Sequence, residues 1–315
     1  MKFLLFDTNG RVFEAKSIIS YELIAEVAAP CDGLRLSFFC QNNIGEICSI
    51  KVYRKDKLVF NGYCDKQKIT FSKSGKICFI YARSSASLLV DNEAVPCQYE
   101  NPSARQLWFS NAKEFGFSTD LPEFYSSNSY RVSKGTSCYG AINDYIFAIS
   151  GMLVYATPEN ELKIYEKSKE VKRLDDYNVL SLSYVINRSE PIGEIDYKIN
   201  SADNYSYHFK SDFVQKMSIK RKRMVNLSSI PLWQREMNVE KIIKNALDEY
   251  YSVSVVLLGN CDLALYDRML IKADDMLQNE EFYVAELTFS KNKNGERTTA
   301  LLKKNIDGEM VNYVA

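Results

Sequence analysis

Short runs in which apolar and polar residues alternate fill the first ninety positions of the sequence. Leu34, Leu36 and Phe38, for example, are separated by Arg35 and Ser37. Alternation with a period of two is typical of strands with one buried face, and the turns between these runs leave no room for a helix. The expected strands cover residues 3–6, 11–14, 23–27, 34–40, 47–54, 58–64, 68–71 and 77–82. Strands this short and closely spaced predict an antiparallel sheet that curls into a barrel or sandwich.

A change to helical signals follows near residue 100. Ser103 is a good N-cap with Gln106 three residues later, and Gly116 stands where a C-terminal stop belongs. A second helix is expected from Ser137 to Gly151. A hairpin over 152–166 comes next, with its turn at 157–160. This middle section is predicted to be α+β.

Strands resume at about residue 178. Leu180, Leu182, Tyr184 and Ile186 share one face of a predicted strand. A helix over 239–250 interrupts the series, because its apolar residues recur at i, i+3, i+4 and i+7.

A short internal repeat connects the two β-rich regions. The segment Ile69-Thr70-Phe71-Ser72-Lys73-Ser74-Gly75 resembles the segment from Leu287-Thr288-Phe289 to Gly295. We interpret the pair as two related barrels that flank the α+β middle. The predicted fold is therefore α+β and mainly β, with a first barrel over 1–92, a middle domain over 93–172 and a second barrel over 173–315. Residues 173–230 fit either the start of the second barrel or the completion of the first.

The balance of charge excludes one class of function. Lysine and arginine together number 40, as do aspartate and glutamate, so the net charge is zero. Proteins held on nucleic acid by phosphate contacts carry a basic excess, so sequence-specific nucleic-acid binding is not expected. The apolar run Phe3–Phe6 is broken by Asp7, which argues against a signal peptide, and no run reaches the ~18 apolar residues of a membrane span. We expect a protein made in a cytoplasm, without membrane insertion.

Eight cysteines could suggest disulfides. In a cytosolic chain of this size they are more often reduced core residues, and the sequence contains no C-x-x-C pair. Cys40 continues the alternation of Leu34, Leu36 and Phe38, and Cys48 leads into Ile50 and Val52. We expect structural thiols.

Groups for catalysis are scarce. The single histidine, His208, lies between Tyr207 and Phe209, where alternation places it on the polar face of a strand. One histidine cannot form a His-rich metal site. The carboxylate pairs 175–176, 274–275 and 280–281 adjoin loop-like sequence and are interpreted as solvated turns. We therefore predict no catalytic, cofactor-binding or metal-binding residues and no enzyme.

One charge run stands out, Lys220-Arg221-Lys222-Arg223. It could contact nucleic acid or an acidic neighbour in an assembly. In a chain that is neutral overall, an exposed strand end or loop is the preferred interpretation.

A longer pattern resembles a known family. Two motifs separated by a hairpin are similar to the N-terminal domain of phage tail baseplate hub proteins. The first is Val59-Phe60-Asn61-Gly62-Tyr63-Cys64-Asp65, and the second runs from Ala82-Arg83-Ser84 to Asp91. Cys64 and Ala82 depart from the commonest residues. The helices and hairpin of the middle section follow in the family's order, and 282–302 resembles the closing hairpin of a second barrel.

The resemblance extends to hubs of contractile tails, R-type tailocins and defective prophages, and to the N-terminal hub part of type VI secretion spikes. It implies a homotrimer whose barrels number six, which adapts a sixfold tail tube to a threefold central spike. Its expected partners are the tube, spike, baseplate wedge and tape-measure proteins. It implies no cofactor, and a place in a virion tail or tail-like particle made in a bacterial cytoplasm. The sequence lacks a following OB domain, so a stand-alone hub is expected. A phage and a headless particle, contractile or not, fit the pattern equally.

Two other functions compete with the hub. The first is a tail-associated enzyme that degrades peptidoglycan, which would need about another hundred residues with a catalytic cluster. The second is a cell-wall-binding tail module, for which the 13% aromatic content is suitable.

Overall fold

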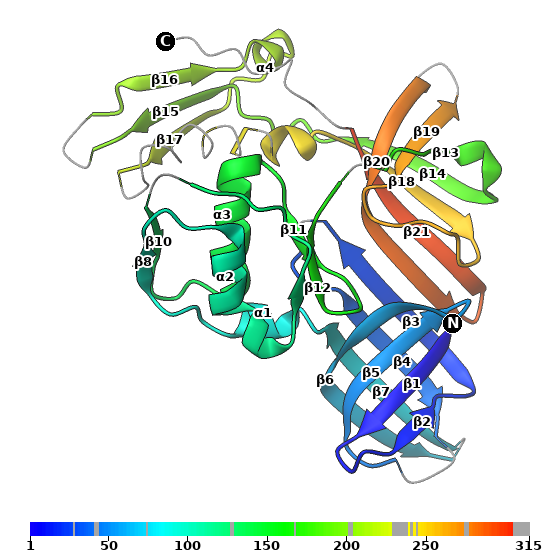
Figure 1. Ribbon diagram of the computed structural model, residues 1–315. Coiled ribbons are helices and arrows are strands. Elements are labelled where there is room, and N and C mark those ends of the chain that lie inside the picture. The colour runs from blue at the N-terminus through cyan, green and yellow to red at the C-terminus, as the bar shows by residue number, and fades with distance from the viewer. Residues whose placement is uncertain are drawn as a thin grey trace. The chain divides into compact units, whose positions relative to one another are not determined.

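The alternating runs at the N-terminus are strands in the computed structural model (Figure 1). Their faces follow the predicted alternation: Leu34, Leu36 and Phe38 are all buried in β4. Residues 8–11, with the predicted turn at Thr8, Asn9 and Gly10, join the first two strands, which pair in antiparallel register. The strands are β1 (Lys2–Asp7), β2 (Val12–Glu14), β3 (Ile18–Glu26), β4 (Gly33–Phe39), β5 (Ile47–Arg54), β6 (Lys57–Ser72) and β7 (Gly75–Ser84).

The structure describes the chain except for residues 28, 41–43, 74, 127–128, 167, 201–203, 229–238, 240–241, 244, 274–276 and 305–315. The chain forms two units. Unit 1 contains 1–168, 257–266 and 285–300, and unit 2 contains 169–256, 267–284 and 301–315.

Strand β6 corrects one detail of the prediction. Two strands were expected, over 58–64 and 68–71, but β6 runs unbroken from Lys57 to Ser72. The register against β7 shifts between Cys64 and Lys66, so the strand contains a bulge there. A bulge moves the following side chains to the other face without ending the strand, which in sequence looks like an interruption.

A second bulge overturns the expectation for Cys48. The pairing of β1 with β5 shifts between Phe6 and Asp7, which matches Asp7 to Ile47 and leaves Cys48 outside the regular register. Ile47 is therefore buried and Cys48 is exposed.

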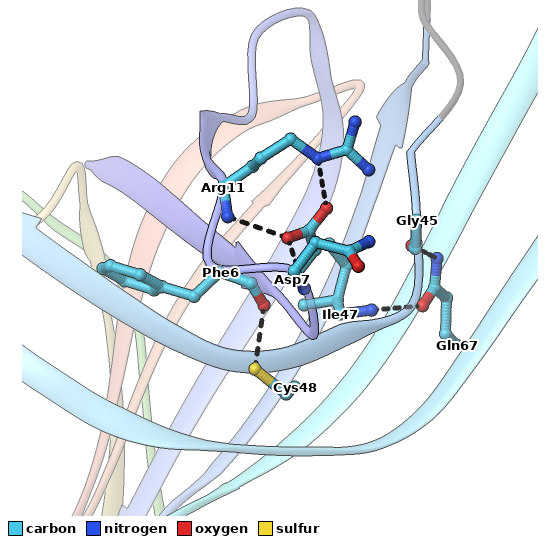
Figure 2. A network of polar contacts seen from close by, with 8 residues as sticks. Phe6, Asp7, Arg11, Gly45, Ile47, Cys48 and Gln67 are labelled. Carbon is cyan, nitrogen blue, oxygen red and sulfur yellow. Dashed lines mark hydrogen bonds and ion pairs between the residues drawn. The ribbon is translucent and has the colours of Figure 1, made fainter.

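Asp7 closes the turn between β1 and β2 (Figure 2). Its carboxylate accepts hydrogen bonds from the backbone N–H groups of Asn9 and Arg11, at 2.9 and 2.8 Å, and from Arg11 Nε at 2.9 Å. Three donors compensate this buried carboxylate for its lost hydration.

The middle section has the two predicted helices with the predicted caps. Ser103 and Ser137 accept hydrogen bonds from the N–H groups of Gln106 and Gly140, and Gly151 ends α3 in left-handed conformation. The first helix ends earlier than predicted, at Asn111, and the left-handed Gly116 instead ends the 3-10 helix that follows it. Helices α2 and α3 lie against each other (Figure 1). The elements are α1 (Ser87–Asp91), β8 (Cys97–Tyr99), α2 (Ala104–Asn111), the 3-10 helix η1 (Lys113–Phe115), β9 (Ser118–Thr119), β10 (Tyr130–Val132), α3 (Cys138–Ser150), β11 (Val154–Ala156) and β12 (Glu161–Ile164).

Unit 2 includes a small sheet of its own, in the order β16-β15-β17 (Figure 1). Ile195 and Phe209 on its buried face pack with Val239, Ile243 and Leu247. The described positions within 239–248 are helical, as predicted. The later elements are β13 (Val171–Arg173), the 3-10 helix η2 (Leu174–Asp176), β14 (Val179–Ile186), β15 (Glu194–Lys198), β16 (Tyr207–Lys210), α4 (Asp212–Lys216), β17 (Lys222–Asn226), β18 (Tyr251–Leu258), β19 (Arg268–Ala273), β20 (Leu277–Asn292) and β21 (Gly295–Lys303).

The main strands follow the hydrogen-bonded order β14-β18-β21-β20-β3-β4-β7-β6-β5-β1-β2, with β19 beside β20 and β13 beside β19. The chain is thus mainly β with a few helices and a large, mostly antiparallel sheet. Among the described strands this order has open ends at β14 and β2, so the pairings close no barrel. Among the described residues, no helix is both long and apolar enough to cross a bilayer.

The strand order repeats itself. The series β14, β18, β21, β20 matches the series β3, β4, β7, β6, and each ends in a strand of 16 residues. The hairpins after these long strands are the two segments that resemble each other in sequence. Gly75 and Gly295 begin the returning strands, both with positive φ.

Gly62 tests the packing of the first long strand. A Cβ at this position would lie 2.1 Å from the backbone oxygen of Arg83, whereas a Cβ at Gly33 in β4 would meet nothing within 4 Å. We expect Gly62→Ala to lower the free energy of unfolding by about 1–3 kcal/mol or more, because backbone must move to relieve the overlap. Gly33→Ala, the control, should change it by no more than about 0.5 kcal/mol. Urea denaturation of both variants measures this, and equal stabilities would contradict the close approach.

Candidate assembly surfaces

The residues that carry the family resemblance meet in an ion-pair cluster. Arg83 at the end of β7 donates from Nε to Asp65 on β6 at 2.6 Å. It also donates from Nη1 and Nη2 to the two carboxylate oxygens of Asp91, at 2.9 and 2.7 Å. One planar guanidinium thereby joins β6, β7 and the end of α1, which a lysine could not do with the same geometry.

The electrostatics of the cluster favour its ionised state. Hydrogen bonds from Arg83 lower the pKa of Asp91 against an opposing effect of burial. The two carboxylates in turn raise the pKa of Arg83, with Asp91 contributing more than Asp65. The residues of these sequence motifs therefore hold β6, β7 and α1 together.

A second contact holds the β region to the middle section within unit 1. Asn160 lies in the turn between β11 and β12 with positive φ. Its side-chain oxygen accepts hydrogen bonds from Ser85 Oγ at 2.5 Å and from Asn61 Nδ2 at 3.2 Å. Asn61 and Ser85 lie within the two motifs that carry the resemblance, but no sequence signal nominated either for this contact.

His208 lies where the alternation predicted, on the exposed face of β16, and its side chain is 59% exposed. Its Nδ1 is 2.8 Å from Oδ1 of Asp196 on β15. Lys222 on β17 lies 2.5 Å from the other oxygen of the same carboxylate. Glu194 lies between Lys210 and Lys222, at 3.5 and 4.0 Å. The result is a ladder of charges across three strands.

The basic run ends in this ladder. Lys222 and Arg223 begin β17 and are exposed, which agrees with the predicted strand end. Lys222, through its hydrogen bond, is also the largest influence in lowering the pKa of Asp196, ahead of His208. The charge of Lys222 is thus matched by carboxylates of the same sheet.

The carboxylate pairs considered in the sequence lie in different kinds of structure. Asp175 and Asp176 form the exposed turn η2, as expected. The pair 274–275 lies outside the described residues. Residues 280–281 are in strand β20 rather than in a turn, because the strand begins at Leu277; Glu281 pairs with Arg268 at 2.6 Å and Glu280 with Lys304 at 2.9 Å.

The described residues contain no cluster of three or more His, Cys, Asp and Glu side chains able to hold a metal. None of the eight cysteines forms a disulfide, and Cys40, Cys78 and Cys138 are buried. Burial raises the pKa of Cys78 to about 11, which keeps this thiol protonated and unreactive at neutral pH.

Exposed apolar side chains mark two places in the sheet. Strand β14 exposes Val179, Leu180, Tyr184, Val185 and Ile186, and the far end of β6 exposes Phe71. The alternation located both strands, but it could not reveal that these faces lack cover. Contiguous exposed apolar residues indicate a surface for another protein.

The fold is shared with proteins of phage tails. No protein-family model matches the sequence, and no curated protein matches it. A tail protein from Neisseria meningitidis superposes with a TM-score of 0.77 at 14% identity, covering 97% of both chains. The 43 kDa tail protein of prophage MuSo2 from Shewanella oneidensis gives 0.76 at 13% identity, covering 96% of this chain and 97% of that one.

A third similar structure comes from a secretion apparatus. It is an Escherichia coli protein described as a component of the type VI secretion system with structural similarity to the T4 tail proteins gp27 and gp5. Its TM-score is 0.57 at 10% identity, over 95% of this chain and 76% of that one. This chain therefore shares its fold with these phage-type tail proteins over nearly its whole length.

The Arg83 cluster predicts a specific pH dependence. Because the native pKa of Asp91 is lowered, its contribution to stability is complete above the unfolded value of about 4 and disappears as pH falls through the native value. Asp91→Asn should therefore be less stable than the parent at pH 7, and the difference should narrow below about pH 4. Chemical denaturation across pH measures it.

Asp175→Asn is the control for this experiment, since Asp175 is an exposed turn residue. Its difference from the parent should be small at every pH. A stability difference for Asp91→Asn that stays constant into acid would contradict the ion-pair explanation.

Proposed function

We propose that this chain is the structural hub of a phage tail or tail-like contractile particle. In this role it forms a homotrimeric ring that adapts a sixfold tail tube to a threefold central spike. The single observation that supports the proposal best is the repeated strand order inside a fold shared, end to end, with prophage tail proteins. A chain with two like modules is what such an adaptor needs.

Symmetry explains why the repeat matters. Head-to-tail contacts between identical chains close into a ring when the rotation is right. Three chains with two modules each present six similar β surfaces on one side, while the rest of the ring keeps threefold symmetry. The proposed modules are tube-like barrels over 1–92 and 173–315, completed in the ring, around the middle domain over 93–172.

The proposed partners follow from the same geometry. A tube protein would contact the six β surfaces, a spike protein the threefold side, and wedge and tape-measure proteins the periphery and the bore. The formal net charge of zero is suited to a channel that must not retain passing nucleic acid. We propose a non-enzymatic role, since the most elaborate polar clusters, around Arg83 and Asp196, are ion pairs that join strands.

The proposal predicts an assembly of three chains. Purified protein should have three times the 36.2 kDa chain mass in native mass spectrometry, and it should copurify with the tube and spike proteins of the same particle. A monomer at every concentration, alone and with those proteins, would contradict the hub. Clearing of cell-wall substrate in zymography would favour the peptidoglycan-degrading alternative, and binding of wall sugars by the monomer would favour the cell-wall-binding one.

A further inference from the structure

The two long strands differ in what covers their outer edges. In β20, the first half pairs with β19, from Arg268 opposite Tyr283 to Ala273 opposite Leu277. The second half pairs antiparallel with β3, from Glu286 opposite Glu26 to Lys291 opposite Tyr21. The whole outer edge of β20 is therefore hydrogen-bonded to neighbouring strands.

In β6 only the first half has such a neighbour. Strand β5 pairs with it from Arg54 opposite Lys57 to Ser49 opposite Tyr63. Further along, the side chain of Gln67 accepts a hydrogen bond from the N–H of Ile47, the first residue of β5, at 2.8 Å. It also donates to the oxygen of Gly45, just before β5, at 3.0 Å (Figure 2). Beyond Gln67, no described strand pairs with the outer edge of β6, which is the place that β3 fills on β20.

The exposure of matching side chains in the two strands differs in the same way. The repeated sequences match Ile69 to Leu287 and Phe71 to Phe289. Phe289 is 7% exposed, with Arg54 over its ring at 4.9 Å, whereas Phe71 is 77% exposed. The same residue type at the same place in the repeat is buried where the neighbouring strand is present and exposed where it is absent.

The counterpart of β3 in the repeated order is β14, since β3 lies beside β4 as β14 lies beside β18. Strand β14 is at one end of the order, so among the described strands its second edge is not paired. It has no charged residue, and seven of its eight residues are exposed. Flat, uncharged, apolar edge strands are the kind that pair with another chain.

We propose that β14 of one copy pairs antiparallel with the outer edge of β6, from Lys68 to Phe71, in the next copy of this chain. We call this contact between copies the β14–β6 joint. It is the counterpart, between two chains, of the β3–β20 pairing within one chain, and it continues the same strand order around the ring. It rests on the proposed hub function, which requires a head-to-tail contact between copies.

The β3–β20 pairing within the chain also predicts the register of β14 against β6. The backbone N–H of Asn187, just after β14, donates a hydrogen bond to the oxygen of Tyr250, just before β18, so these two residues lie opposite each other. Counting back along the antiparallel pair from this position places Tyr184 opposite the buried Val253. The buried series Val253, Val255, Leu257 matches Leu34, Leu36, Phe38, so Tyr184 corresponds to Leu23, which lies opposite Leu34.

Within the chain, Leu23 lies opposite Phe289 and Ala25 opposite Leu287. The joint therefore places Tyr184 opposite Phe71 of the next copy, and Ile186 opposite Ile69. Both pairs are apolar and of kinds that stabilise neighbouring strands. Side chains that are exposed in one copy would be covered in the ring.

Cysteine cross-linking tests the register directly. In the Ile69→Cys/Ile186→Cys double variant, a short thiol-specific cross-linker should join copies into covalent trimers on a denaturing gel. The control Ile69→Cys/Val185→Cys places the second thiol on the opposite face of β14 and should give no more product than the parent, whose own eight thiols set the background.

Charge substitution tests the edge without a cross-linker. Phe71→Asp and Ile186→Asp change exposed side chains, so each monomer should keep its circular dichroism and urea midpoint. We expect each to weaken assembly at least about tenfold in concentration-dependent mass photometry. Val12→Asp is the matched control, because Val12 is an exposed apolar residue on β2 at the other end of the strand order, and it should leave assembly unchanged.

The outcomes separate the two proposals. A trimer that survives Phe71→Asp and Ile186→Asp and gives no specific cross-link would overturn the β14–β6 joint while leaving the hub intact. Disruption by Val12→Asp alone would place the joint at β2 and also overturn it. If the thiol introduced by Ile186→Cys cross-links to a tube protein instead of to another copy, β14 belongs to a different partner and the joint is again overturned. A parent chain that stays monomeric with tube and spike proteins present would overturn both proposals.

Discussion

Backbone hydrogen bonding along two strands of 16 residues is the constraint on which this structure depends. A strand of that length needs neighbours along both edges, or its polar groups depend on water. In β20 the neighbours are β21 on one side, and β19 followed by β3 on the other. In β6 they are β7 and, for half the length, β5. The difference between a complete and an incomplete edge connects the fold to its proposed assembly.

The other conspicuous polar contacts stabilise this arrangement. The guanidinium of Arg83 fixes the middle of β6 to β7 and α1, close to the bulge at Cys64–Lys66 where the strand changes face. Gly62 allows the backbones to approach there, because any side chain would overlap the oxygen of Arg83. Residues that looked like a motif in the sequence therefore act together at one place, where the long strand is bent and held.

Much of this architecture could be predicted from the sequence because its determinants are local. Ser103, Ser137, Gly116 and Gly151 set the helix ends through their own backbone geometry, and alternation set the strand faces. The bulges could not be predicted, since an extra residue depends on the partner strand; this is why β6 looked like two strands and Cys48 looked buried. The exposure of β14 could not be predicted from the sequence either. An apolar strand has the same residue pattern whether the surface that covers it belongs to the same chain or to another one.

Hydrogen exchange, measured by mass spectrometry on the assembled and the dissociated protein, is the sharpest test of the pairing between β14 and β6, because it reports the backbone hydrogen bonds themselves. We expect slow exchange for residues 286–291 of β20 in both states, because β3 pairs with them within the chain. In residues 68–71 of β6 and 179–186 of β14, the amides that point to the unpaired edge should exchange fast when dissociated and become protected together on assembly. The amides bonded to β7 and β18 should be protected in both states. If these edge amides exchange as fast after assembly as before it, the proposed pairing of β14 with β6 is wrong.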